Sequence, residues 1–153
     1  MFAAYQSETR ISLDDVHYGP LCPGERELGL LEDVSGKLVL ELAFGAAQNS
    51  IALAKWGAHV VAMDISPAQL GAAKALVARE DVRVHLARGD MERLGVFADA
   101  RFDVVISSFG WELVPDLAAC FDECRRVLKT GGRLVVCTVH PLAAFEWDQT
   151  EKA

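Results

Sequence analysis

Residues 38–48 read LVLELAFGAAQ, an apolar run that passes into small residues and then into a helical pattern. Small residues between a strand and a helix allow a tight turn, in which a ligand can approach the backbone and meet the amide groups at the start of the helix. The stretch therefore predicts a strand, a turn and a helix. Any strand that turns sharply into a packed helix also needs small residues, so the ligand-binding and the purely structural interpretations of this turn both remain open.

Four further apolar runs are each short enough for a strand. They are His59–Met63, Val82–Leu86, Phe102–Ser107 and Leu134–Val139. Several are continuously apolar, which is typical of parallel strands covered by helices on both faces. Segments of helical periodicity lie between the runs, so the sequence predicts an α/β protein with a doubly wound parallel sheet of five strands.

Two of the intervening helices carry boundary signals. Ser66-Pro67-Ala68-Gln69 combines a capping hydroxyl with a proline suited to the first helical position, and it predicts a helix start. Further on, apolar residues at helical spacing predict a buried face: Leu117, Phe121, Cys124 and Leu128. Gly131-Gly132 can adopt the positive φ that ends a helix, so this helix is expected to stop there.

The composition is that of one folded domain. The chain has 153 residues, of which 52% are hydrophobic and 24% charged, and no apolar run reaches the roughly 18 residues that suggest a membrane-spanning helix. Its 15 basic and 22 acidic residues give a net charge of −7, which argues against binding to nucleic acid phosphates or to an anionic membrane surface. We expect a small-molecule ligand. Because the N-terminus lacks a basic region followed by an apolar stretch, we also expect a cytoplasmic location.

The four cysteines, Cys22, Cys120, Cys124 and Cys137, fit neither the paired spacing of a zinc site nor the density of a small secreted scaffold. We expect reduced thiols and no bound metal. Cys120 and Cys124 lie four residues apart in a helical pattern, so they share one face and are expected to be buried.

Acidic residues follow two neighbouring strands at the point where each strand ends. Asp64 comes 64 − 45 = 19 residues after Gly45, and Asp90 follows the third strand. A carboxylate at the position of Asp64 can accept hydrogen bonds from two ribose hydroxyls, as in doubly wound nucleotide sites. The alternative for Asp64 is a solvated turn residue, but a second acid on the adjacent strand end favours a nucleotide-type site.

The run from Leu38 to Val139 resembles the class I S-adenosylmethionine-dependent methyltransferases. Five stretches in chain order carry the resemblance: Glu41–Ala47, Val61–Ile65, Gly89–Met91, Phe102–Val105 and Arg126–Leu134. The resemblance implies a Rossmann-like fold, S-adenosyl-L-methionine as cofactor, and methyl transfer to an oxygen, nitrogen or carbon atom of a small molecule. It also implies a cofactor-binding core at residues 37–141, preceded by a lid or helical segment at 1–36 and followed by a tail at 142–153.

The resemblance further implies roles for individual residues. Gly45 with its neighbours Glu41, Ala43 and Phe44 would face the methionine part of the cofactor, and the backbone around Ser107 would meet the amino-acid end. Asp64 would hold the ribose while Ile65 packs on the adenine. Asp90 would accept from the adenine amino group, with Met91 beside that ring. The substrate would be faced by aromatic residues that could equally be ordinary core or surface residues: Tyr18, Phe109 and Trp111.

The first motif departs from the family pattern. Where the family usually has Gly-x-Gly-x-Gly, this chain has Ala43-Phe44-Gly45-Ala46-Ala47. The benzyl group of Phe44 could crowd the methionine moiety or lie against the sulfonium as a cation–π partner. We expect cofactor binding to be retained with lowered affinity.

His140 directly follows the fifth strand, at the end of the sheet where this fold binds ligands. It is the predicted general base, because its unperturbed pKa lies near neutrality. The alternative is a simple turn residue before Pro141. Two other classes of function also stay open: a noncatalytic cofactor-binding or scaffold subunit, and a dinucleotide-dependent oxidoreductase. The oxidoreductase is disfavoured, because Gln48 stands where the dinucleotide fingerprint has Gly or Ala.

The family has a sixth and a seventh strand beside the fifth, but only 153 − 139 = 14 residues follow Val139. We therefore expect the sheet to stop at five strands, with Val135–Val139 as an open apolar edge. The chain could be a fragment, a second chain could supply the missing strands, or two copies could pair as a homo-oligomer. We favour pairing or complementation, with Phe145 and Trp147 packing at this edge.

Overall fold

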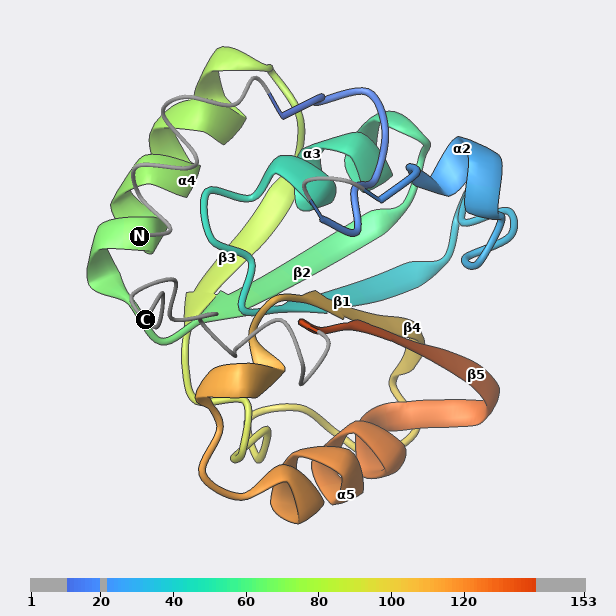
Figure 1. The fold of residues 1–153 in the computed structure, drawn as a ribbon, viewed down its shortest axis with the longest axis vertical. Coiled ribbons are helices and arrows are strands. Elements are labelled where there is room, and N and C mark those ends of the chain that lie inside the picture. Colours follow the sequence, from blue (N-terminus) through green and yellow to red (C-terminus); the bar gives the residue numbers. More distant parts are fainter. Residues whose placement is uncertain (1–10, 20–21, 140–153) are drawn as a thin grey trace, which may run out of the picture.

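The computed structural model describes residues 11–19 and 22–139, which form a parallel sheet between two layers of helices (Figure 1). The elements in chain order are α2 (Glu25–Leu28), β1 (Leu38–Leu42), α3 (Gln48–Lys55), β2 (His59–Asp64), α4 (Pro67–Arg79), β3 (Val84–Arg88), β4 (Phe102–Ser108), the 3-10 helix η1 (Trp111–Leu113), α5 (Leu117–Val127) and β5 (Leu128–Cys137). Every pairing is parallel, and the strand order is β3-β2-β1-β4-β5. The predicted fold class is confirmed.

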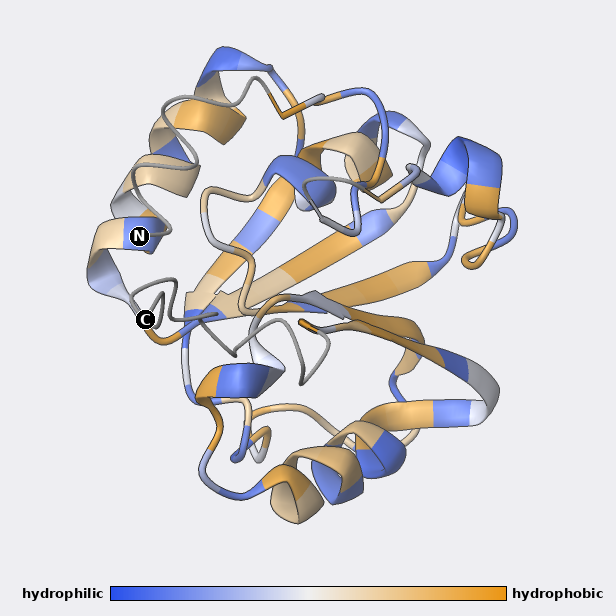
Figure 2. Cartoon of the chain, viewed as in Figure 1, coloured by the Kyte–Doolittle hydropathy of each residue, from blue (hydrophilic) through white to orange (hydrophobic). Residues whose placement is uncertain are grey.

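The layers follow from the hydropathy of the elements. Figure 2 shows hydrophobic residues along the strands, while hydrophilic residues lie mainly on outer helix faces and in loops. Helices α3 and α4 cover one face of the sheet and α5 covers the other (Figure 1). Within the described ranges, no helix has both the length and the apolar character to cross a bilayer.

The N-terminal segment contributes to the core on the α3 face. Val16, Tyr18, Leu31 and Val34 are each at most 2% exposed and pack with strand and α3 residues. This part of the chain is therefore packed against the sheet, although the predicted division into lid, core and tail stays a prediction.

The predicted bounds of two strands were wrong. The third strand was expected over Val82–Leu86 but spans Val84–Arg88, because α4 runs to Arg79 and a turn with Asp81 in a left-handed conformation follows it. The fifth strand was expected over Leu134–Val139 but begins at Leu128, six residues earlier, and ends at Cys137, two residues earlier. Leu128 already pairs with Phe102, and the register then shifts before Val104.

The predicted end of α5 was wrong, and its predicted buried face was wrong at Leu117 and Phe121 but correct at Cys124. The helix ends at Val127, and Gly131, with φ of 77°, lies within the irregular start of β5. Cys120, Cys124 and Val127 face the sheet and are fully buried, which confirms the burial expected for both cysteines. Leu117 and Phe121 are 46% and 49% exposed. Apolar residues occupy two overlapping stripes of this helix. The stripe with Cys120, Cys124 and Val127 packs against the sheet, and the stripe with Leu117 and Phe121 is left half exposed.

The start of α4 is as predicted. The Ser66 side chain accepts a hydrogen bond from the backbone N–H of Gln69 at 3.3 Å, and Pro67 is the first helical residue. This cap fixes the turn that directly follows Asp64 at the end of β2.

Candidate functional site

A cavity of about 790 Å³ opens across the carboxyl ends of β1, β2, β3 and β4. Nine of the predicted residues line it: Glu41, Ala43, Phe44, Gly45, Asp64, Ile65, Asp90, Met91 and Phe109. Tyr18, Ser107 and Trp111 do not line it, and His140 lies outside the described residues. The parallel topology thus gathers the strand-end residues of separate motifs at one site.

Asp64 is held in a fixed orientation at the end of β2. One carboxylate oxygen accepts the backbone N–H of Gly45 at 3.0 Å, and the other accepts that of Ser66 at 2.8 Å. The side chain lines the cavity although the residue is only 8% exposed. Since each carboxylate oxygen has a second lone pair, Asp64 can still accept hydrogen bonds from a ligand.

Asp90 has a similar arrangement after β3. One of its carboxylate oxygens accepts the backbone N–H of Glu92 at 3.0 Å. The residue before Asp90 is Gly89, whose backbone passes close to Met63. Only glycine fits there, because a Cβ at that position would lie 2.6 Å from the sulfur of Met63. Both acidic residues therefore sit in turns that their own side chains stabilise.

Along the turn between β1 and α3, backbone φ alternates between positive and negative values. Ala43, Gly45 and Ala47 have φ values of 55°, 56° and 65°, all in the left-handed region. These are the three positions at which the resembled family usually has glycine, which adopts this conformation without steric cost. The turn thus keeps the backbone path of the glycine-rich motif with two strained alanines.

Phe44, between the first two of these positions, is 4% exposed and packs with Ala47, Ala62 and Ala73. Most of its surface therefore contacts the core beneath α4, while part of it lines the cavity. The effect of the ring on the cofactor stays a prediction.

Glu41 is a buried carboxyl at the floor of the cavity. It is 3% exposed and accepts a hydrogen bond from the Ser50 hydroxyl. Burial raises the pKa of Glu41 to about 8, and the nearby charge of Asp64 acts in the same direction. Glu41 is therefore expected to carry a proton at neutral pH.

The turn after β4 packs directly on the turn after β1. A Cβ on Gly110 would lie 2.3 Å from that of Ala43, so only glycine fits there. Phe109 lines the cavity, and its backbone is in the left-handed region with φ of 59°. Its backbone N–H donates to the carbonyl oxygen of Cys137 at 2.9 Å. Ser107 faces the interior instead: it is fully buried, and its hydroxyl has no partner among the described residues.

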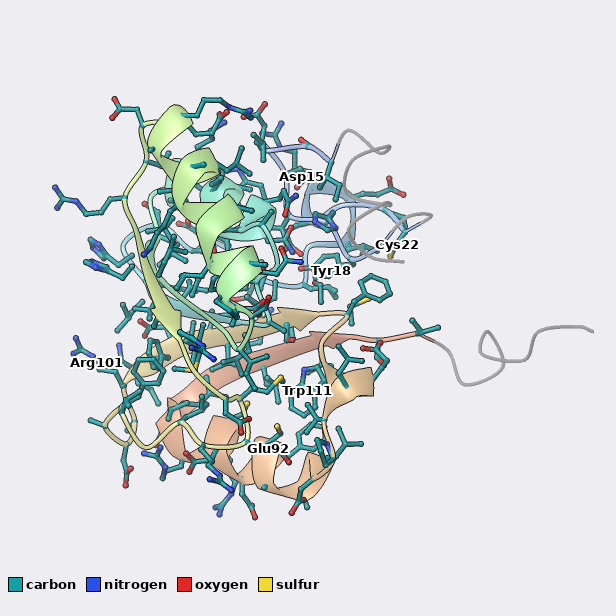
Figure 3. The ribbon with its side chains drawn as sticks, turned by 90° about the vertical axis from the view of Figure 1, so that its left-hand side faces the viewer. Asp15, Tyr18, Cys22, Glu92, Arg101 and Trp111 are labelled. Atoms are coloured by element: carbon teal, nitrogen blue, oxygen red, sulfur yellow. The ribbon has the colours of Figure 1, made fainter. Side chains whose placement is uncertain are left out.

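Two predicted substrate residues belong to the core. Tyr18 is 2% exposed, and its hydroxyl donates to Glu25 at 2.6 Å. Trp111 is 4% exposed and packs against Phe121, with the ring centroids 4.6 Å apart and the planes tilted by 38°. The two residues lie on opposite faces of the sheet (Figure 3). Each packs in the hydrophobic core on its own face of the sheet, and neither lines the cavity.

Sequence reasoning missed the contact between Asn49 and His17. The Asn49 amide accepts the backbone N–H of His17 at 2.9 Å and donates to its carbonyl at 3.0 Å. Both residues line the cavity, and burial lowers the pKa of His17 below its usual value. The only sequence signal was a polar residue in the first turn of α3, and nothing in the sequence indicated its distant partner.

The charge of the cavity has one sign. The carboxylates of Asp64, Asp90 and Glu92 line it beside the protonated Glu41, and no lysine or arginine of the described part of the chain does. Such a site favours a positively charged ligand. S-adenosyl-L-methionine has a sulfonium, an ammonium group and a ribose diol, so the acidic lining and the free lone pairs of Asp64 fit that cofactor.

Comparison with known proteins agrees with this geometry. The family described as "Methyltransferase domain" matches residues 40–136. A demethylmenaquinone methyltransferase of Clavibacter sepedonicus is 43% identical over 104 residues, covering 68% of this chain and 42% of that protein. A ubiquinone biosynthesis O-methyltransferase of Xylella fastidiosa is 38% identical over 113 residues, covering 73% and 46%. The chain thus spans less than half the length of these curated relatives.

Among solved structures, an S-adenosylmethionine-dependent methyltransferase from Mesorhizobium loti superimposes with a TM-score of 0.68 at 28% identity, covering 75% of this chain and 52% of that one. The family match includes β2, β3 and β4 in full and most of β1 and β5. The chain therefore belongs to the methyltransferase-domain family and has the class I fold.

Proposed function

We propose that the protein binds S-adenosyl-L-methionine and transfers its methyl group to a small-molecule acceptor. The observation that carries the proposal is Asp64, which is held by two backbone amides and lines an acidic cavity in a methyltransferase-domain chain. The cofactor supplies an electrophilic methyl group on a sulfonium.

In this proposal, Asp64 accepts from the ribose hydroxyls and Asp90 from the adenine amino group. Ile65 and Met91 contact the adenine, and both line the cavity. Glu41, Ala43, Phe44 and Gly45 surround the methionine end, with the backbone at Ser107 beside it. The chain's contribution to rate is alignment and exclusion of water, which raise the effective concentration of the acceptor.

We assign the acceptor to apolar, uncharged compounds, with a quinol or phenol as the class to test first. Phe109, Leu113 and Val139 line the cavity beside the methionine end, and the acidic lining repels carboxylates and phosphates. The names of the two curated relatives, which concern quinone biosynthesis, support the same class. His140 remains the proposed general base for an acceptor that must lose a proton.

Calorimetric titration with S-adenosylmethionine, S-adenosylhomocysteine and NAD tests the cofactor. Asp64→Ala is expected to weaken S-adenosylhomocysteine binding at least about tenfold, because hydrogen bonds to a charged acceptor contribute about 1.5–3 kcal/mol. Asp122→Ala, at an exposed carboxylate on α5, is the matched control and should bind like the wild type. Unchanged affinity in folded Asp64→Ala, or preferential binding of NAD, would contradict the proposal.

Formation of S-adenosylhomocysteine in the presence of short-chain quinols and phenols tests turnover. Product with these acceptors supports the enzyme, whereas cofactor binding without turnover on any acceptor favours the noncatalytic subunit. The cytoplasmic location remains a proposal that cell fractionation tests.

We also propose that a second copy of the chain pairs along the free edge of β5. In the described part of the chain β5 pairs with β4 alone, so its other edge carries unpaired backbone groups. Residues of β5 and α5 also line a groove of mixed character, with Phe121, Leu128 and Leu134 beside Asp122, Arg125 and Lys129. Phe145 and Trp147, expected at this edge, lie outside the described residues.

A further inference from the structure

Two cysteines far apart in sequence contact adjacent residues of the N-terminal segment, Tyr18 and Gly19. The Cys137 sulfur, at the end of β5, lies 2.5 Å from the carbonyl oxygen of Tyr18. The backbone N–H of Cys22 donates to the carbonyl of the next residue, Gly19, at 3.3 Å. If Gly19 had a Cβ, that atom would lie 3.9 Å from the Cβ of Cys22. Cys137 and Cys22 therefore lie next to two consecutive residues, Tyr18 and Gly19, and Figure 3 shows Cys22 and Tyr18 in the same region of the molecule.

The environments of the four cysteines differ. Cys22 is exposed and Cys137 is half-buried, whereas Cys120 and Cys124 are fully buried under α5. Burial raises the pKa of Cys137, and a charge on Cys22 raises it further, as expected for two thiols that lie close together. Cys22 is thus the accessible thiol and Cys137 the neighbour within reach.

We propose that Cys22 and Cys137 form a reversible disulfide that joins the N-terminal segment to the end of β5. The oxidant is a small disulfide such as oxidised glutathione. The Cys22 thiolate attacks it, giving a mixed disulfide and releasing one glutathione thiolate. The Cys137 thiolate then attacks the Cys22 sulfur and releases the second. Two protein thiols are oxidised, one glutathione disulfide is reduced, and the two protons pass to the released glutathione.

The bond would act on the rim of the cavity. A Cβ on Gly19 would lie 2.6 Å from the ring of Phe109, so the Tyr18–Gly19 peptide rests on that side chain. Phe109 is in turn hydrogen-bonded to the carbonyl of Cys137, and both Gly19 and Phe109 line the cavity. Joining Cys22 to Cys137 therefore fixes the rim that a ligand must pass.

Non-reducing peptide mapping of the full chain after treatment with oxidised glutathione tests the proposal. Trypsin should release residues 11–26 linked to residues 134–152, and dithiothreitol should separate them. The midpoint of thermal unfolding should rise by several degrees on oxidation and return on reduction, since the bond closes a long loop. No such link, a link to Cys120 or Cys124, or a link between two chains would overturn the proposal.

Cysteine variants distinguish the attacking thiol, Cys22, from the resolving thiol, Cys137. Cys137→Ser should accumulate glutathione on Cys22, because the resolving thiol is gone, and Cys22→Ser should accumulate no adduct. Cys120→Ala, at a buried cysteine outside the pair, is the matched control and should still form the link. Absence of a glutathione adduct on Cys22 in folded Cys137→Ser would contradict the assignment of the attacking thiol.

The disulfide is also expected to slow ligand exchange at the cavity. This effect rests on the proposed function, and the dissociation rate of S-adenosylhomocysteine measures it. S-adenosylhomocysteine should dissociate more slowly from the oxidised protein than from the reduced protein. An equal rate with the link present would remove the effect on the rim but leave the disulfide. Failure of both forms to bind would contradict the cofactor assignment and leave the peptide map unchanged.

Discussion

At the scale of single residues, the turn after β1 shows how this chain replaces glycine. Ala43 and Ala47 hold left-handed conformations that cost an L-residue about 1–2 kcal/mol relative to the right-handed region. The family's glycine pattern is therefore explained by backbone geometry. The sequence predicted the turn, but the strain at each alanine became visible only from φ.

Comparison of Ala43→Gly with Ala46→Gly measures this strain. Both substitutions remove one methyl group from a half-buried position and add the same freedom to the unfolded chain, but only Ala43 has a positive φ. Ala43→Gly should therefore be more stable than Ala46→Gly by about 1–2 kcal/mol in urea unfolding. Equal stability of the two variants would show that the strain is absent.

Glu41→Gln should change how stability depends on pH. The folded carboxyl holds its proton up to a pKa of about 8, while an unfolded Glu loses it near 4.3, as in model peptides. The contribution of Glu41 to the free energy of unfolding of the wild type is therefore fully present below the unfolded pKa. This contribution is lost as the pH rises toward 8. Glutamine cannot ionise, so the stability of Glu41→Gln relative to wild type should increase between pH 5 and pH 8. Urea midpoints at several pH values check this, and a constant difference would contradict the raised pKa.

At the scale of elements, α5 holds the long connection between β3 and β4 through one side chain. The Arg126 guanidinium donates to the carbonyls of Leu94 and Phe97, each at 2.9 Å, and to Glu123 and Asp99. The sequence motif containing Arg126 was recognised, but the role of the arginine was not. Its partners lie in a connection without periodicity, which offers no sequence signal.

Arg126→Ala should destabilise the protein by about 2 kcal/mol or more, because it removes charge-assisted hydrogen bonds and leaves two carbonyls without their partner. Arg125→Ala is the matched control. That side chain is 83% exposed and reaches Asp122 only at 3.8 Å, so this variant should unfold near the wild-type midpoint. Similar midpoints for the two variants would show that Arg126 does not anchor the connection.

At the scale of the whole molecule, the unpaired edge of β5 predicts self-association. Sedimentation at low micromolar concentration should give a dimer, and the amides of residues 134–137 should exchange slowly in it. A monomer with fast exchange at these amides would contradict pairing. A monomer with slow exchange would mean that another part of the same chain covers the edge.

The sequence by itself determined the fold class, the cap of α4 and the acidic residues at the ends of β2 and β3. These features depend on periodicity and on local hydrogen bonds, which neighbouring residues fix. Tertiary structure alone decided that Tyr18 and Trp111 enter the core, and that Asn49 holds His17 across 32 residues. It also decided that Cys137 and Cys22 contact the adjacent residues Tyr18 and Gly19. Each of these outcomes depends on packing between segments far apart in the chain, and local pattern contains no information about which distant surface a side chain will meet.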